Sequence, residues 1–195
     1  MLPSKQGLYS PENEHDNCGA GFICSLQGKK TNDIIHKALD ILDCLEHRGA
    51  VSADGKTGDG AGILIEIPHE FLKDQCSFNL PEFGEYAVGM VFLPKKDNQR
   101  SFCIGVLEAE FENQGLNVLG WRKVPVRTEI VGKIAAQTEP KIMQIFVGKG
   151  HNKLTEQNFK NKLFCARKIS EHKIYESNLS QNSFFYVPSL SNRTI

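Results

Sequence analysis

The residues with the clearest chemical potential are Cys18 and the glycines that follow it, Gly19 and Gly21. A thiol is a strong nucleophile once it is deprotonated, but it needs a base nearby. As the first residue of a processed chain, Cys18 would carry its own base, because an α-amino group has a pKa of about 7.7–8.0. Glycines have no Cβ, so a substrate could approach the backbone closely. Taken alone, a cysteine followed by glycine favours the simpler alternative that a free cysteine packs in a core, and an N-terminal nucleophile needs the support of further residues.

Two later stretches could surround such a nucleophile, namely 45–50 (Leu-Glu-His-Arg-Gly-Ala) and 57–63 (Thr-Gly-Asp-Gly-Ala-Gly-Ile). Taken alone, Arg48 is a cation at a helix end, where it stabilises the helix by about 0.3–1 kcal/mol. Taken alone, the glycine-rich stretch is a tight turn. It lacks the Gly-Lys-Ser/Thr ending of a phosphate loop and the acidic spacing of a calcium loop.

In this order, the three stretches resemble the start of the large subunit of glutamate synthases, a class II glutamine amidotransferase domain of the N-terminal-nucleophile hydrolase superfamily. The resemblance is close from Gly7 to about Phe71, looser to Phe184, and close again over 186–195. It implies that residues 1–17 are a leader that is removed and that 18–195 form the N-terminal part of the amidotransferase domain. The site residues implied by the resemblance are Cys18 as the catalytic nucleophile, with Gly19, Arg48, Asp59 and Gly60 in support. Asp59 would orient either the cysteine amine or its own loop.

The chemistry implied by the resemblance is hydrolysis of the glutamine side-chain amide through a cysteine thioester. In the complete family protein, the ammonia combines with 2-oxoglutarate and reduction gives glutamate. FMN, an iron–sulfur cluster and a small electron-transfer subunit or ferredoxin belong to the remaining synthase domains, so we expect no cofactor and no metal in this segment. The family takes its oxyanion hole from an Asn-Gly pair, and no Asn-Gly occurs in the 195 residues. We therefore expect an incomplete domain with little glutaminase activity alone.

Four alternatives stay open on the sequence. One is another class II amidotransferase, making phosphoribosylamine, glucosamine phosphate or asparagine, although those begin Met-Cys-Gly without a leader. A second is an N-terminal-nucleophile hydrolase acting on other amides. A third is a papain-like pair with His47 or His69 as the base, although we expect a helix-end His47 and a surface His69. The fourth is a catalytically inactive structural or docking domain.

Composition narrows the class of protein. A chain of 195 residues with 40% hydrophobic residues fits one domain with a substantial core. Its formal net charge of zero argues against a nucleic-acid or anionic-membrane partner. No apolar run approaches the roughly 20 residues that span a bilayer, and residues 1–17 contain no secretory h-region. Six scattered cysteines indicate reduced cytoplasmic thiols rather than disulfides or a zinc site.

Apolar periodicity and turn residues predict an α+β fold without a dinucleotide fingerprint. The expected strands are 19–26, 62–67, 86–93, 117–126, 141–147 and 184–190. The expected helices are 31–46, 68–72, 101–113 and 155–176. The inward residues of the last two helices are expected to be Phe102, Val106, Leu107, Phe159, Leu163, Ala166 and Ile169. The resemblance adds a four-layer αββα sandwich, and the five cysteines other than Cys18 are expected to be structural.

Overall fold

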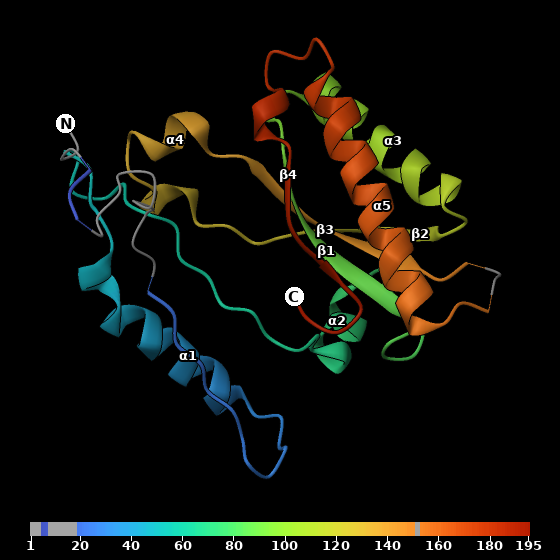
Figure 1. The fold of residues 1–195 in the computed structure, drawn as a ribbon, viewed down its shortest axis with the longest axis horizontal. Helices are drawn as coiled ribbons and strands as arrows, with labels where there is room; N and C mark the ends of the chain where they lie inside the picture. Colours follow the sequence, from blue (N-terminus) through green and yellow to red (C-terminus); the bar gives the residue numbers. More distant parts are fainter. Residues whose placement is uncertain (1–4, 8–18, 151–152) are drawn as a thin grey trace. The chain divides into compact units, whose positions relative to one another are not determined.

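The computed structural model describes residues 5–7, 19–150 and 153–195 (Figure 1). Cys18, His151 and nearly all of the predicted leader therefore lie outside the described residues. The chain divides into two compact units. The first contains the described residues up to Ile63 together with Gly132–Ile134, and the second contains Leu64–Val131 and Ala135–Ile195.

The second unit is built on one antiparallel sheet. Its strands are β1 (Tyr86–Leu93), β2 (Asn117–Lys123), β3 (Lys141–Gly148) and β4 (Tyr186–Ser191), in the order β2-β3-β1-β4. In the β1–β3 register, Val88 lies opposite Phe146. These four strands confirm four of the six predicted ones and the α+β class.

Two long helices, α3 (Asp97–Asn113) and α5 (Glu156–Tyr175), pack side by side over one face of this sheet (Figure 1). The Thr155 hydroxyl caps α5 by accepting from the Asn158 amide at 3.2 Å. The inward prediction is confirmed for Leu107, Phe159, Leu163 and Ala166, which are buried. It is wrong for Phe102 and Ile169, which are exposed because the buried helix positions are instead Cys103, Phe111, Ser170 and Ile174.

The opposite face of the sheet holds a smaller apolar cluster, since alternate strand residues point to opposite faces. It joins Tyr86, Val88 and Phe146 to Ile67 and Leu72. Leu72 belongs to α2 (His69–Gln75), which is longer than the predicted 68–72 helix. The predicted strand 62–67 is mostly wrong. Only residues 65–67 form backbone hydrogen bonds of this kind, and their partner is the short segment 193–195.

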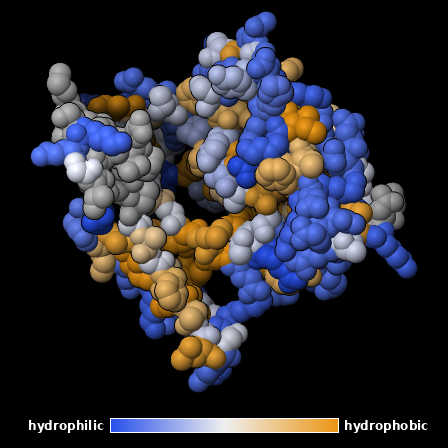
Figure 2. All heavy atoms as spheres, in the orientation of Figure 1, coloured by the Kyte–Doolittle hydropathy of each residue, from blue (hydrophilic) through white to orange (hydrophobic). Residues whose placement is uncertain are grey.

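The first unit contains α1 (Asn32–Cys44), which is followed by a 3-10 turn, η2 (Glu46–Arg48). This confirms the predicted helix 31–46. The predicted strand 19–26 is wrong, because no described residue forms a ladder with it, and Phe22 and Leu26 are exposed. Its end is a turn in which the Gly28 amide donates to the Ser25 carbonyl at 3.0 Å. Figure 2 shows apolar side chains gathered over α1.

The remaining helical pieces are short and belong to the second unit. They are η3 (Thr128–Ile130), α4 (Ala135–Thr138) and η4 (Asn182–Phe184). Within the described part of the chain, none of the helices has the length and apolar character needed to cross a bilayer.

Candidate active site

Gly19, the residue after Cys18, lies against the end of α1 and the 3-10 turn. A Cβ at Gly19 would fall 2.9 Å from Leu45 Cδ2 and 3.4 Å from Arg48 Cγ. Two residues on, a Cβ at Gly21 would fall 2.6 Å from Ile41 Cγ2. Contacts under 3 Å are closer than carbon atoms normally pack, so a larger residue at either position would have to displace these side chains. Two predicted site residues, Gly19 and Arg48, are thus neighbours.

The 3-10 turn fixes Arg48 at the end of the helix. Its amide donates to the Leu45 carbonyl at 2.8 Å, and its side chain is exposed with its stem beside Gly19. His47 contacts the backbone instead, with Nδ1 2.9 Å from the Cys44 carbonyl. The prediction of a helix-end histidine at position 47 is confirmed. The turn therefore directs a permanently charged guanidinium group toward solvent near the residue that follows Cys18.

Asp59 joins the two ends of the glycine-rich loop, which runs from residue 50 to residue 62. Its Oδ2 accepts from the Ala50 amide at 2.9 Å, and its own amide donates to the Ala50 carbonyl at 3.2 Å. A Cβ at Gly58 would lie 2.9 Å from that same carbonyl, so the two ends of the loop approach closely. Nothing lies within 4 Å of a Cβ at Gly60. The described contacts of Asp59 are all with its loop, and the cysteine amine lies outside the described residues.

Asp54 organises the tip of the loop and was missed by the sequence reasoning. Its Oδ1 accepts from the Thr57 amide at 2.8 Å and the Lys56 amide at 3.1 Å, and its Oδ2 accepts from the Thr57 hydroxyl at 2.6 Å. These hydrogen bonds, led by the Thr57 hydroxyl, hold the pKa of the Asp54 carboxyl far below its ordinary value. The Asp54-Gly55 pair is a local turn signal that could have indicated this role.

A distant segment, Gly132–Ile134, also binds to this carboxylate. The Ile134 amide donates to Asp54 Oδ2 at 3.2 Å. A Cβ at Gly132 would fall 2.7 Å from Asp54 Oδ2 and 2.7 Å from the Thr57 nitrogen, so only glycine fits there. No local sequence signal predicts this contact, because about 80 residues separate the partners.

His69 is not the surface residue that we expected. Its Nδ1 lies 3.0 Å from the Tyr86 hydroxyl, and its side chain is only 13% exposed. Burial raises the pKa of Tyr86 to about 12, so Tyr86 is a neutral partner at physiological pH. The correction follows from α2, which packs over the apolar cluster of the sheet and carries His69 into its edge.

The cysteines of the described residues differ in their suitability as nucleophiles. Burial raises the pKa of Cys103 to about 11 and also raises that of Cys76, which keeps both thiols protonated and unreactive. Cys24, Cys44 and Cys165 are exposed, and the prediction that all five cysteines other than Cys18 are structural stays a prediction. Among the described residues, no group of three or more histidine, cysteine or acidic side chains is placed to hold a metal ion.

The family model of the class-II glutamine amidotransferases matches residues 18–195. The chain belongs to this family. The match begins at Cys18 and includes Gly19, Arg48 and the Asp59 loop. The geometry described above is therefore that of a class-II glutamine amidotransferase chain.

The relatives of this amidotransferase chain are much longer proteins. It is 40% identical over its whole length to a glutamate synthase [NADPH] large chain of Bacillus subtilis, and it covers 13% of that protein. It is 41% identical over its whole length to a glutamate synthase [NADH] of Saccharomyces cerevisiae and covers 9% of it. With a ferredoxin-dependent glutamate synthase 2 of Arabidopsis thaliana it shares 39% identity over 93% of its length, covering 11% of that protein.

Proposed function

We propose that this chain is the glutaminase part of a glutamate synthase and that Cys18 is its nucleophile. The observation that carries the proposal is the family match, whose first residue is Cys18 and whose next residue, Gly19, lies beside Arg48. A cysteine in that position could combine a free α-amine, a close backbone approach and a nearby cation. The proposal also gives four residues the supporting role that the resemblance implies, namely Gly19, Arg48, Asp59 and Gly60.

In the proposed reaction, the Cys18 α-amine takes the thiol proton and the thiolate attacks the amide carbon of glutamine. The tetrahedral oxyanion collapses, the carbon–nitrogen bond breaks, and the ammonium group returns the proton so that ammonia leaves. Water then cleaves the γ-glutamyl thioester to release glutamate. Arg48 would project into the active site beside Gly19, and Asp59 would hold the loop through its hydrogen bond with Ala50. Donors to the oxyanion are worth about 2.7–4 kcal/mol each, and the Asn-Gly pair that the resemblance implies would supply them from outside residues 1–195.

The proposed fold is a four-layer αββα sandwich, of which the layer of α3 and α5 and the sheet beneath it would be two layers. From the resemblance we also propose that 18–195 are the N-terminal part of the domain and that 1–17 are a leader. In the longer protein, ammonia would be used with 2-oxoglutarate in domains that hold FMN and an iron–sulfur cluster. The described residues offer no cluster of ligands that fits such a centre, so no step of the proposed reaction passes through one.

The proposed partners are glutamine and the remaining domains of the same protein, with a small electron-transfer subunit or ferredoxin as the electron source. Relatives are named for NADPH, NADH and ferredoxin, so the donor is not assigned. The cytoplasm is the proposed compartment, and the five free cysteines among the described residues support it.

The test joins an N-terminal mass measurement to selective labelling of the full-length protein. We expect a chain that starts at Cys18 and that a diazoketone analogue of glutamine alkylates once, at Cys18. Cys18→Ala should abolish labelling and glutamine hydrolysis. Cys24→Ala and Cys44→Ala, which remove exposed thiols in the same unit, should leave both unchanged.

Two results would overturn the proposal. Active protein that still begins at Met1 would exclude the free amine as base and direct attention to a histidine. A processed protein that is neither labelled nor hydrolyses glutamine would favour the structural or docking alternative.

A further inference from the structure

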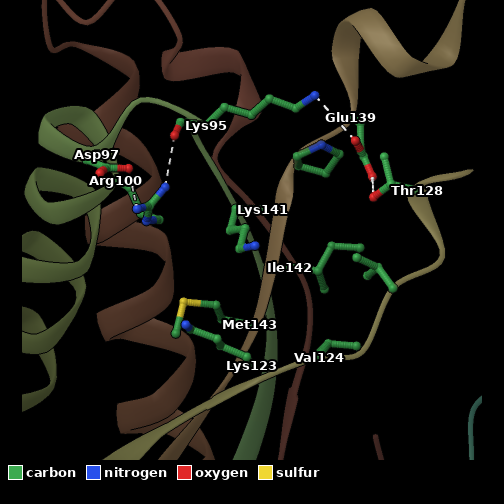
Figure 3. Close-up of a pocket in the computed structure, with 12 residues that line it drawn as sticks. Lys95, Asp97, Arg100, Lys123, Val124, Thr128, Glu139, Lys141, Ile142 and Met143 are labelled. Carbon is green, nitrogen blue, oxygen red and sulfur yellow. Dashed lines mark hydrogen bonds and ion pairs between the residues drawn. The ribbon is translucent and has the colours of Figure 1, made fainter. Parts of the chain in front are cut away.

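A cavity of about 460 Å³ lies at the end of the sheet in the second unit (Figure 3). This volume is within the range of about 300–1,000 Å³ that is typical of small-molecule sites. Its walls come from the start of α3, the last residues of β2, the first residues of β3 and the connection between those two strands. It lies outside the residues assigned to glutamine hydrolysis.

Four cations line this cavity, namely Lys95, Arg100, Lys123 and Lys141. Two of them are paired with the two carboxylates of the lining. Arg100 Nη2 lies 2.5 Å from Asp97 Oδ1, and Lys95 Nζ lies 3.3 Å from Glu139 Oε2. No hydrogen bond or ion pair joins Lys123 Nζ or Lys141 Nζ to another described residue, although the charge of Lys141 helps to lower the pKa of Glu139. The cavity therefore carries an excess charge of about two positive units from those two ammonium groups.

The sheet register places these two lysines on the same face. Lys123 lies opposite Met143 in the β2–β3 pair, and Lys141 is two residues from Met143 along β3. Residues in this diagonal relation have Cα atoms about 7–8 Å apart, within reach of long side chains. Figure 3 shows Lys123, Lys141 and Met143 on the side of the strands that faces Arg100. Like charges on neighbouring strands repel each other, and an anion placed between the two ammonium groups would offset that repulsion.

Apart from Thr128, the uncharged lining is apolar and comes from Val124, Val126, Pro140, Ile142 and Met143, of which Met143 shares a face of the sheet with the two lysines. A bare ion would leave this surface in contact with water, whereas a ligand with a short hydrocarbon body would cover it. Arg100 is held in place by a second hydrogen bond, from Nη1 to the Lys95 carbonyl at 2.9 Å, and it still has free N–H donors.

We propose that this cavity binds a small aliphatic dicarboxylate, whose two carboxylates pair with Lys123 and Lys141 and whose carbon chain packs on Met143, which lies on the same face of the sheet as the two lysines. The site is independent of the proposed glutamine hydrolysis. Glu139 limits its affinity, because this carboxylate repels the ligand while it accepts from the Thr128 hydroxyl at 2.7 Å.

The test is titration calorimetry on the full-length protein with succinate, inorganic phosphate and acetate at matched ionic strength. We expect succinate to bind more tightly than either. Lys123→Gln/Lys141→Gln should weaken succinate binding at least about tenfold, since it removes both unpaired charges. The matched control is Lys29→Gln/Lys73→Gln, which changes the net charge equally at two exposed lysines outside the cavity.

Glu139→Gln should change succinate affinity in the opposite direction. It removes the repelling carboxylate and frees Lys95, so it should tighten succinate binding severalfold. Phosphate binding more tightly than succinate, equal losses in the two lysine pairs, or weaker binding by Glu139→Gln would each overturn the proposal. Glutamine hydrolysis without succinate should be unchanged in all these variants, so the two proposals fail separately.

Discussion

At the scale of single residues, Gly19 sets the distance between the backbone after Cys18 and the stem of Arg48. In Gly19→Ala, the new methyl group would fall 2.9 Å from Leu45 Cδ2 and 3.4 Å from Arg48 Cγ. Both neighbours are flexible side-chain atoms, so the fold should persist while the geometry at Cys18 shifts. A misplacement of about 1 Å can reduce a rate about a hundredfold. We expect kcat for ammonia release from glutamine by the full-length protein to fall about ten- to a hundredfold.

The matched control is Gly105→Ala, an exposed position inside α3 where a Cβ meets nothing within 4 Å. It should leave kcat unchanged and should stabilise the helix by about 0.5–1 kcal/mol. A Gly19→Ala protein with the wild-type kcat would show that this close approach does not position the nucleophile.

Gly132 is the residue that lets a distant segment reach the loop tip. In Gly132→Ala, the methyl group would lie 2.7 Å from the backbone nitrogen of Thr57, which cannot move away as a side chain can. Overpacking of this kind costs about 1–3 kcal/mol. We expect faster hydrogen exchange at the Thr57 and Ile134 amides, which Asp54 now holds. Gly62→Ala, whose Cβ would meet nothing within 4 Å, should leave these rates as they are.

The sequence indicates the local part of this site but not its long-range part. Arg48 and Asp59 follow from motifs, and the turn that encloses Asp54 follows from an Asp-Gly pair. The Asp54 contact with Ile134 joins segments 80 residues apart, so it depends on the fold. His69 is misjudged for the same reason, since its partner Tyr86 lies on another element.

At the scale of elements, Glu156 connects the start of α5 to the terminal segment. Its Oε2 lies 2.7 Å from Arg193 Nη2, and its Oε1 lies 2.7 Å from Lys160 Nζ. Hydrogen bonds from Arg193 and then Lys160 lower the pKa of Glu156 from 4.5 to about 2. The folded protein thus binds this proton less readily than the unfolded chain does. The stabilisation is complete above the unfolded pKa and is lost as the pH falls toward the folded pKa.

Glu156→Gln should therefore be less stable than wild type at neutral pH. The difference between their urea midpoints should shrink as the pH is lowered from about 5 to about 3. Glu112→Gln, a change at an exposed carboxylate of α3, should show no such trend. A pH-independent difference between wild type and Glu156→Gln would contradict the proposed ion pairs.

Element boundaries were predictable where apolar pattern and pairing agree. The strand 86–93 is apolar throughout and buried between two neighbours, and its bounds are confirmed. The run 19–26 is also apolar in part, but an isolated run cannot form a ladder. Helix α3 begins four residues before the predicted start, because its first turns bury a polar residue. Gln99 donates to the Ser180 hydroxyl at 2.8 Å and accepts from the Gln181 amide at 3.0 Å, and no apolar periodicity reveals this.

At the scale of the whole molecule, the two units differ in how they are stabilised. Both buried apolar clusters lie in the second unit, where Ile145 and Phe146 are fully buried. None of the described residues from 19 to 63 is buried to that degree. Since stability follows buried apolar area, the first unit should open at a lower free energy than the sheet of the second unit.

A substitution at the N-cap residue of α5 tests whether the two units unfold separately. Thr155→Ala removes the acceptor for the Asn158 amide and should destabilise the second unit by about 1 kcal/mol. Hydrogen exchange should then accelerate at slowly exchanging β1 and β3 amides, such as those of Val88 and Ile145, by about fivefold. Rates over residues 32–44 should not change, because α1 belongs to the other unit. Thr155→Ser keeps the hydroxyl and should restore the rates in the sheet. Equal acceleration in α1 and the sheet would instead mean that the two units unfold as one cooperative body, and the loop around Asp59 would then share the stability of the sheet.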